Sequence, residues 1–79
     1  MLRAMGFGLY SNSNNFNELV RWGKELLETD KRESLVSIVV LDEHGRVKLT
    51  LAEIERDDSG KPEFTLLRSK EIIDRFSGD

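Results

Sequence analysis

Residues 34–42 read Ser-Leu-Val-Ser-Ile-Val-Val-Leu-Asp, the most β-branched and most continuously apolar run in the chain. Such a run, bounded by polar residues, predicts a buried strand. Successive side chains of a strand point to opposite faces, and here both alternating sets are apolar apart from Ser37. The two sets are Val36, Ile38 and Val40 on one face and Leu35, Val39 and Leu41 on the other. We therefore expect both faces of the sheet to be covered at this strand.

Around this strand, residues 34–67 are predicted to form a three-stranded antiparallel meander. Residues 42–45, Asp-Glu-His-Gly, have the composition of a tight turn in which Gly45 takes a positive φ. A second polar turn, at residues 57–62, leads to a third strand at residues 63–67.

The middle strand of this meander is predicted to be irregular. Its apolar residues alternate at Val47, Leu49 and Leu51, but Ile54 breaks the alternation. One extra residue in a strand shifts every later side chain to the other face. The pattern therefore predicts a β-bulge near Ala52 or Glu53.

Before the meander, residues 15–30 predict an amphipathic helix that packs on one face of the sheet. Asn15 is placed as an N-cap, with Glu18 at the capping-box position. Gly23 falls in the middle of the apolar face, where glycine costs about 1 kcal/mol in helix propensity relative to alanine. Close approach of the helix to the sheet is the expected compensation. The apolar face comprises Phe16, Leu19, Val20, Gly23, Leu26 and Leu27.

The two ends of the chain carry weaker patterns. Residues 1–14 predict an arm or a short edge strand, because Gly6 and Gly8 weaken a strand interior. The run Gly6-Phe7-Gly8 lacks the third glycine of a dinucleotide fingerprint, so it predicts no phosphate-binding loop. Residues 69–77 predict a short closing helix, with Ser69 as the N-cap and Gly78 ending it.

Together these elements predict a single small α+β domain over residues 1–79. It consists of a three-stranded antiparallel meander, with a possible N-terminal edge strand, one amphipathic helix on one face and a short C-terminal helix. A chain of 79 residues buries roughly 60–65% of its unfolded surface, so its stability should be modest.

Composition excludes several classes of protein. The chain has no cysteine, so disulfides, thiolate metal sites and a cysteine nucleophile are excluded, and a cytoplasmic location is expected. Its longest apolar run is far shorter than the ~20 residues that span a bilayer, which argues against a membrane protein. The net charge of −3 disfavours nonspecific attraction to nucleic acid or anionic lipid.

No residue pattern predicts catalysis, a cofactor or a metal site. His44 is the only histidine, and it lies in a predicted turn beside two acids, which is too few ligands for a transition metal. Residues 57–60 lack the spacing of a calcium loop. We therefore expect a protein that is not an enzyme.

The apolar pattern of residues 35–41 also bears on oligomeric state. One long helix can cover only one face of three strands, and a two-turn helix hides only part of the other face. Large exposed apolar patches are rare in monomers, so we expect a homodimer that forms by packing sheet faces or pairing edge strands.

The expected function is a small protein-interaction or regulatory protein, resembling an adaptor or an inhibitor, that acts through a sheet face or an acidic strip. Tryptophan is frequent at binding hot spots, and closely spaced acids attract basic partners. The candidate partner-binding residues are Trp22, Glu53, Glu55, Asp57 and Asp58.

The alternative is a nucleic-acid-binding module, although nucleic acid is the less favoured partner. It would use a basic edge that forms when two copies of the chain associate. The basic residues of that edge would be Lys24, Lys31, Arg32, Arg46 and Lys48.

Overall fold

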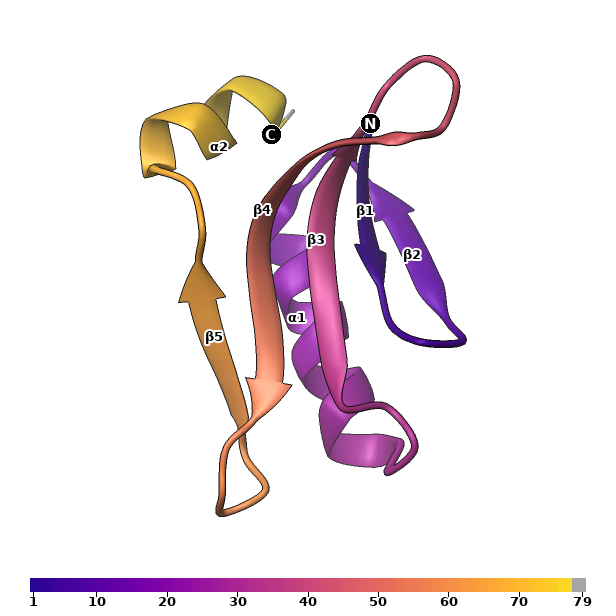
Figure 1. Ribbon diagram of the computed structural model, residues 1–79. Helices are drawn as coiled ribbons and strands as arrows, with labels where there is room; N and C mark the ends of the chain where they lie inside the picture. The colour runs from indigo at the N-terminus through magenta and orange to yellow at the C-terminus, as the bar shows by residue number, and fades with distance from the viewer. Residues whose placement is uncertain (78–79) are drawn as a thin grey trace.

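The computed structural model describes residues 1–77 and shows an α+β fold with one antiparallel sheet of five strands and two helices (Figure 1). The strand order is β2-β1-β3-β4-β5, so the apolar strand β3 lies at the centre. The strands are β1 (Leu2–Met5), β2 (Tyr10–Ser13), β3 (Leu35–Leu41), β4 (Val47–Arg56) and β5 (Pro62–Leu66), and the helices are α1 (Phe16–Thr29) and α2 (Lys70–Phe76).

The predicted meander is present as β3, β4 and β5, but the sheet has five strands and not three, because residues 1–14 form two further strands. β1 and β2 make an antiparallel hairpin, and β1 also pairs with β3 in the interior of the sheet. Leu2 and Ala4 of β1 are fully buried. Gly6 and Gly8 lie in the hairpin turn, so they do not weaken either strand. β2, and not β1, is the edge strand.

Helix α1 begins and ends within one residue of the predicted range. The side chain of Asn15 accepts a hydrogen bond from the Glu18 N–H at 3.0 Å, as expected for an N-cap. At the other end, the Arg56 guanidinium donates to the carbonyl oxygens of Leu27 and Asp30. These are groups that a helix C-terminus leaves without intrahelical partners. Arg56 thereby ties α1 to the end of β4.

Gly23 lies where α1 comes closest to the sheet, which confirms the predicted helix face. A Cβ atom at this position would lie 2.8 Å from Ile54 Cδ1 and 3.1 Å from Val36 Cγ1. Both neighbours are fully buried. Only glycine allows this approach without displacing the core.

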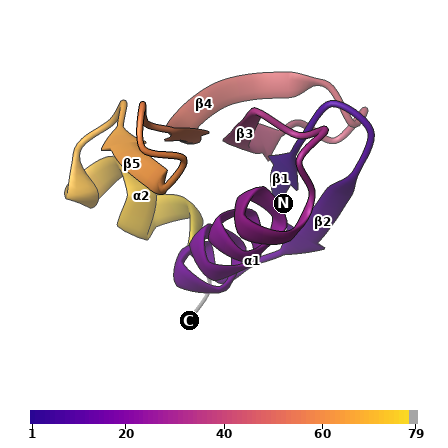
Figure 2. The same ribbon diagram turned by 90° about the horizontal axis from the view of Figure 1, so that it is seen from below.

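The predicted β-bulge is present, one residue earlier than expected. The register between β3 and β4 shifts between Ile38 and Val39, where Leu51 has no partner, and shifts again between Val40 and Leu41. As a result the consecutive residues Leu51 and Ala52 are both fully buried in the same core. Bulges strengthen the local twist of a strand, and β3 and β4 bend strongly over their length in Figures 1 and 2.

Both hairpin turns of the meander use one aspartate in the same way. Asp42 accepts hydrogen bonds from the backbone of His44 and Arg46, and Asp57 accepts them from Ser59 and Lys61. Gly45 and Gly60 take positive φ angles of 79° and 86°. A turn with an aspartate first and a positive-φ glycine three residues later explains both segments.

Helix α2 lies on the same side of the sheet as α1 (Figure 2). Ser69 caps it by accepting from the Ile72 N–H, and Ile73 joins the core beneath α1. The predicted end at Gly78 lies outside the described residues. Neither helix covers the other side of the sheet, which we call the open face.

The open face is less apolar at its surface than the sequence predicts. Of the three apolar β3 side chains that point to it, Val39 and Leu41 are only 3% and 7% exposed, and Leu35 is 40% exposed. Arg3 and Thr50 lie beside Val39 in register, one on each neighbouring strand. Within residues 1–77 no helix has the length and apolarity needed to cross a bilayer.

Candidate protein-interaction surface

The open face divides into two parts of different chemistry. Ile54 and Phe64 point toward the helices, so their strand neighbours at odd positions point to the open face. Near the β1–β2 turn the large side chains are apolar, and on β4 and β5 the charged side chains are carboxylates. We call these parts the apolar patch (Met5, Phe7 and Leu35) and the acidic patch (Glu53, Glu55 and Glu63).

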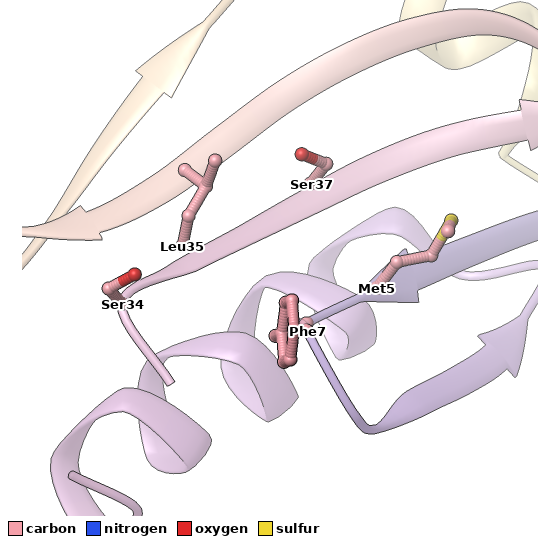
Figure 3. A pocket seen from close by; sticks show the side chains of 6 residues that line it. Met5, Phe7, Ser34, Leu35 and Ser37 are labelled. Carbon is pink, nitrogen blue, oxygen red and sulfur yellow. The ribbon is translucent and has the colours of Figure 1, made fainter. Parts of the chain in front are cut away.

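The apolar patch surrounds a shallow hollow of about 360 Å³ beside the β1–β2 turn (Figure 3). Met5 and Leu35 project from neighbouring strands, and Phe7 stands at the turn. The Phe7 side chain is 99% exposed. A large apolar side chain without any protein contact gains nothing for the fold, because its surface stays in water.

The turn that carries Phe7 is held by Glu33, which lies two residues before the start of β3. The Glu33 carboxylate accepts hydrogen bonds from the backbone N–H groups of Phe7, at 2.6 Å, and of Gly8, at 3.0 Å. Among residues 1–77, Glu33 is the one charged residue that is buried, with 4% of its surface exposed. The turn is closed by a further bond from the Gly6 N–H to the Leu9 carbonyl.

Gly6 is required by this arrangement. A Cβ atom on Gly6 would lie 2.7 Å from Glu33 Oε2, closer than real Cβ contacts. The sequence Gly6-Phe7-Gly8 therefore does hold an anion with its backbone amides, but the anion is the carboxylate of the chain's own Glu33. These hydrogen bonds fix the turn.

The acidic patch includes two of the acids that the sequence singled out and one that it did not. Glu55 of β4 lies directly opposite Glu63 of β5, and Glu53 lies opposite Thr65. Like charges directly opposite each other on a sheet destabilise it. Here both Glu55 and Glu63 are exposed, and a basic partner would relieve their repulsion.

The other two acids of the predicted strip lie in the turn after β4. Asp57 accepts from the Ser59 hydroxyl and from the N–H groups of Ser59 and Lys61. These bonds, the Ser59 hydroxyl foremost, hold the pKa of Asp57 below its usual value. Asp58 is exposed beside it. The structure therefore separates the strip into the acidic patch and a turn that Asp57 organises.

Trp22 lies on the helix-covered side of the sheet, opposite the open face. It is half-buried and packs against the core between the helices and the sheet. That position matches a ring that covers the rim of the core, and it does not join Trp22 to either patch.

The basic residues considered for nucleic acid are spread over the molecule. Lys24 and Lys48 lie over the rings of Phe64 and Phe76. Arg32, near the α1–β3 loop, pairs with Asp30, and Arg46 pairs with Asp42 in the turn at the other end of β3. A single chain therefore has no basic edge that unites them. Residues 1–77 contain no group of three His, Cys, Asp or Glu side chains that could hold a metal ion.

Three residues of this surface were missed from the sequence: Phe7, Glu33 and Glu63. Two glycines flanking an aromatic residue were a usable signal for a turn that presents it. No local signal points to Glu33, because its partners are 25 and 26 residues away in the chain. Glu63 joins Glu55 only through the register of β4 and β5.

Comparisons of the chain with protein-family models, with curated proteins and with solved structures find no match.

Proposed function

We propose that the chain is a small non-enzymatic protein-interaction domain that binds a partner protein through the open face. The observation that carries the proposal is the Phe7 turn. Its side chain is 99% exposed, yet its backbone is held by a buried carboxylate 2.6 Å away. Burying a charge is costly, and here the buried charge fixes a side chain that contributes nothing to the core.

The physical role of such a turn is preorganisation. A binding loop that is already ordered loses less conformational entropy when a partner binds, which increases affinity. Aromatic side chains inserted into a pocket of the partner are frequent hot spots. The hollow beside Phe7 can accept an apolar side chain of the partner in return, and the acidic patch favours a partner with basic residues. The cysteine-free composition supports the cytoplasmic location that we retain in this proposal.

Replacing Phe7 with serine is expected to abolish partner binding without affecting the fold. Loss of a hot-spot side chain reduces affinity by roughly 30-fold or more. The stability of the fold should change by less than about 0.5 kcal/mol, because the ring touches no core residue. Affinity capture from cell extract, with quantification of each bound protein, compares the wild type with the variant.

Val47→Ser is the matched control for this experiment. Val47 is also an exposed apolar residue, 53% exposed, and its pairing with Leu41 places it on the same open face, but at the opposite end of β3 from the Phe7 turn. If the proposal is correct, at least one captured protein binds to both the wild type and Val47→Ser but not to Phe7→Ser. Equal recovery of every bound protein by all three would contradict it.

A second copy of the chain is the other occupant of the open face that the sequence predicted. Two copies would bring two acidic patches into one interface, and like charges oppose such an arrangement. The burial of Val39 and Leu41 within one chain also reduces the apolar surface that a dimer would cover. A partner of different sequence is therefore the stronger proposal, and sedimentation of the purified chain at micromolar concentration distinguishes the two.

A further inference from the structure

The outer edge of β5 has backbone groups that pair with no other strand of residues 1–77. The bonds Leu67 N–H to Leu51 O and Asp57 N–H to Lys61 O show that odd-numbered residues face β4. In an antiparallel strand the alternate residues direct their N–H and C=O groups the opposite way. The groups of Phe64 and Leu66 therefore point away from β4, on the outer side of the strand that Figure 1 shows at the edge of the sheet.

On the helix side of this edge lies a second hollow, of about 270 Å³. Its walls are apolar at Phe64 and Leu66 of β5, Phe16 of α1 and Ile73 of α2, and polar at Asn17, Lys70, Asp74 and Ser77. The volume is below the ~300–1,000 Å³ of small-molecule pockets. It suits one or two apolar side chains that enter beside the strand.

On the opposite side of the same edge the chemistry is acidic. Glu63 points to the open face from β5, and Glu55 lies behind it on β4. The edge thus has on one side a hollow with apolar walls at Phe64, Leu66 and Ile73, and on the other side carboxylates.

We propose that the β5 edge binds an extended segment of a partner protein, which adds a sixth strand and in which apolar residues alternate with basic ones. The inference deepens the proposed function, and rests on it, by naming the mode in which such a partner binds. Strand addition uses main-chain hydrogen bonds for affinity and pockets for alternate side chains for specificity.

The register follows from the geometry of an antiparallel pair. Residues of the added strand opposite Phe64 and Leu66 share hydrogen bonds with them and point to the same side, toward the helix-side hollow. The residue between them lies opposite Thr65, and the residue beyond the partner of Phe64 lies opposite Glu63 at a Cβ separation of about 5 Å; both point to the open face. Apolar residues therefore belong opposite Phe64 and Leu66, and a lysine or arginine belongs opposite Glu63.

A second copy of the chain fits this edge poorly. Pairing β5 with itself would place Glu63 and Glu55 of both copies on one face of the enlarged sheet, where like charges repel. Pro62 at the start of β5 has no N–H to donate, which shortens the edge that is available to any added strand. The part of the edge that can pair is therefore short and centred on Phe64 and Leu66. The carboxylates beside it favour a partner segment with basic residues.

The test uses a synthetic peptide in which valine alternates with lysine, and amide hydrogen exchange measured by NMR. In the free protein the Phe64 and Leu66 amides should exchange quickly, while the Leu67 amide, bonded to Leu51, is protected. Addition of the peptide is expected to protect Phe64 and Leu66. Peptides of the same composition with the valines grouped, or with glutamate in place of lysine, should bind at least about tenfold more weakly.

Leu66→Pro and Leu66→Ala form the matched pair of variants. Proline at position 66 removes the outward N–H but no hydrogen bond to β4. Leu66→Pro should therefore bind the peptide about tenfold or more weakly than Leu66→Ala does. The Leu67 amide should remain protected from exchange in both variants. Glu63→Gln should weaken binding roughly threefold.

Failure of the peptide to bind, or binding that leaves Phe64 and Leu66 unprotected, would overturn the inference. Phe7→Ser, which should not affect peptide binding, separates the two proposals. If Phe7→Ser loses a partner while the peptide fails to bind, the proposed function stands and the β5 inference falls.

Discussion

Replacing Gly23 with leucine is expected to lower the free energy of unfolding by about 1 to 3 kcal/mol, although leucine is a much better helix former than glycine. The Cβ atom alone would lie 2.8 Å from Ile54 Cδ1 and 3.1 Å from Val36 Cγ1. Both side chains are fully buried and cannot move into solvent, so α1 would have to shift away from the sheet. Urea denaturation followed by circular dichroism measures the change.

Two further variants separate overpacking from helix propensity. Gly23→Ala adds the clashing Cβ but gains about 1 kcal/mol in propensity, so it should lie within about 1 kcal/mol of the wild type. Glu25→Leu places a leucine on the exposed side of the same helix and should change stability by less than about 0.5 kcal/mol. A Gly23→Leu variant as stable as the wild type would show that α1 presents another face to the sheet.

Replacing Glu33 with glutamine is expected to cost about 1 to 3 kcal/mol of stability and to loosen the Phe7 turn. The carboxylate accepts two backbone N–H groups, one on each oxygen. Glutamine keeps the shape but turns one acceptor into an N–H₂ donor, which then faces a backbone donor. One N–H of the turn loses its partner in a partly buried position. Denaturation and amide exchange at Phe7 and Gly8 report the two effects.

Glu28→Gln is the control for the loss of charge. Glu28 is exposed on α1, so its replacement should change stability by less than about 0.5 kcal/mol and leave the Phe7 turn protected. If Glu33→Gln were as stable as the wild type with an unchanged turn, Glu33 would not be the residue that holds Phe7 in place. The case for a preorganised binding turn would then fail as well.

The elements that were predicted correctly are those with local physical causes. The N-cap at Asn15, the apolar face centred on Gly23 and the positive φ of Gly45 each depend on residues a few positions apart. The bulge in β4 was recognisable because an extra residue changes the alternation within the strand itself. The sequence also indicated the α+β class, since periods of two and of 3.6 residues succeed each other along the chain.

The N-terminal hairpin could not be predicted with the same means. β1 and β2 have four residues each, too few for a clear period, and β2 is made of polar residues. β1 forms a strand because it pairs with the apolar strand β3, and this pairing buries Leu2 and Ala4. A long-range contact decided the secondary structure of this segment.

By itself, then, the sequence determined the class of the fold, the central strand, helix α1 and its inward face, and the two turns of the meander. Only the tertiary structure decided that both helices lie on one side, that Glu33 holds the Phe7 turn, and that Glu63 lies opposite Glu55 beside a free strand edge. The physical reason is the distance along the chain over which each interaction acts. Capping, periodicity and turn preferences act over a few residues, whereas a surface is assembled from segments that the register of the sheet brings together. The alternation of residues 35–41 shows that both faces of β3 are apolar, but it contains no information on where the chain 30 residues away will pack.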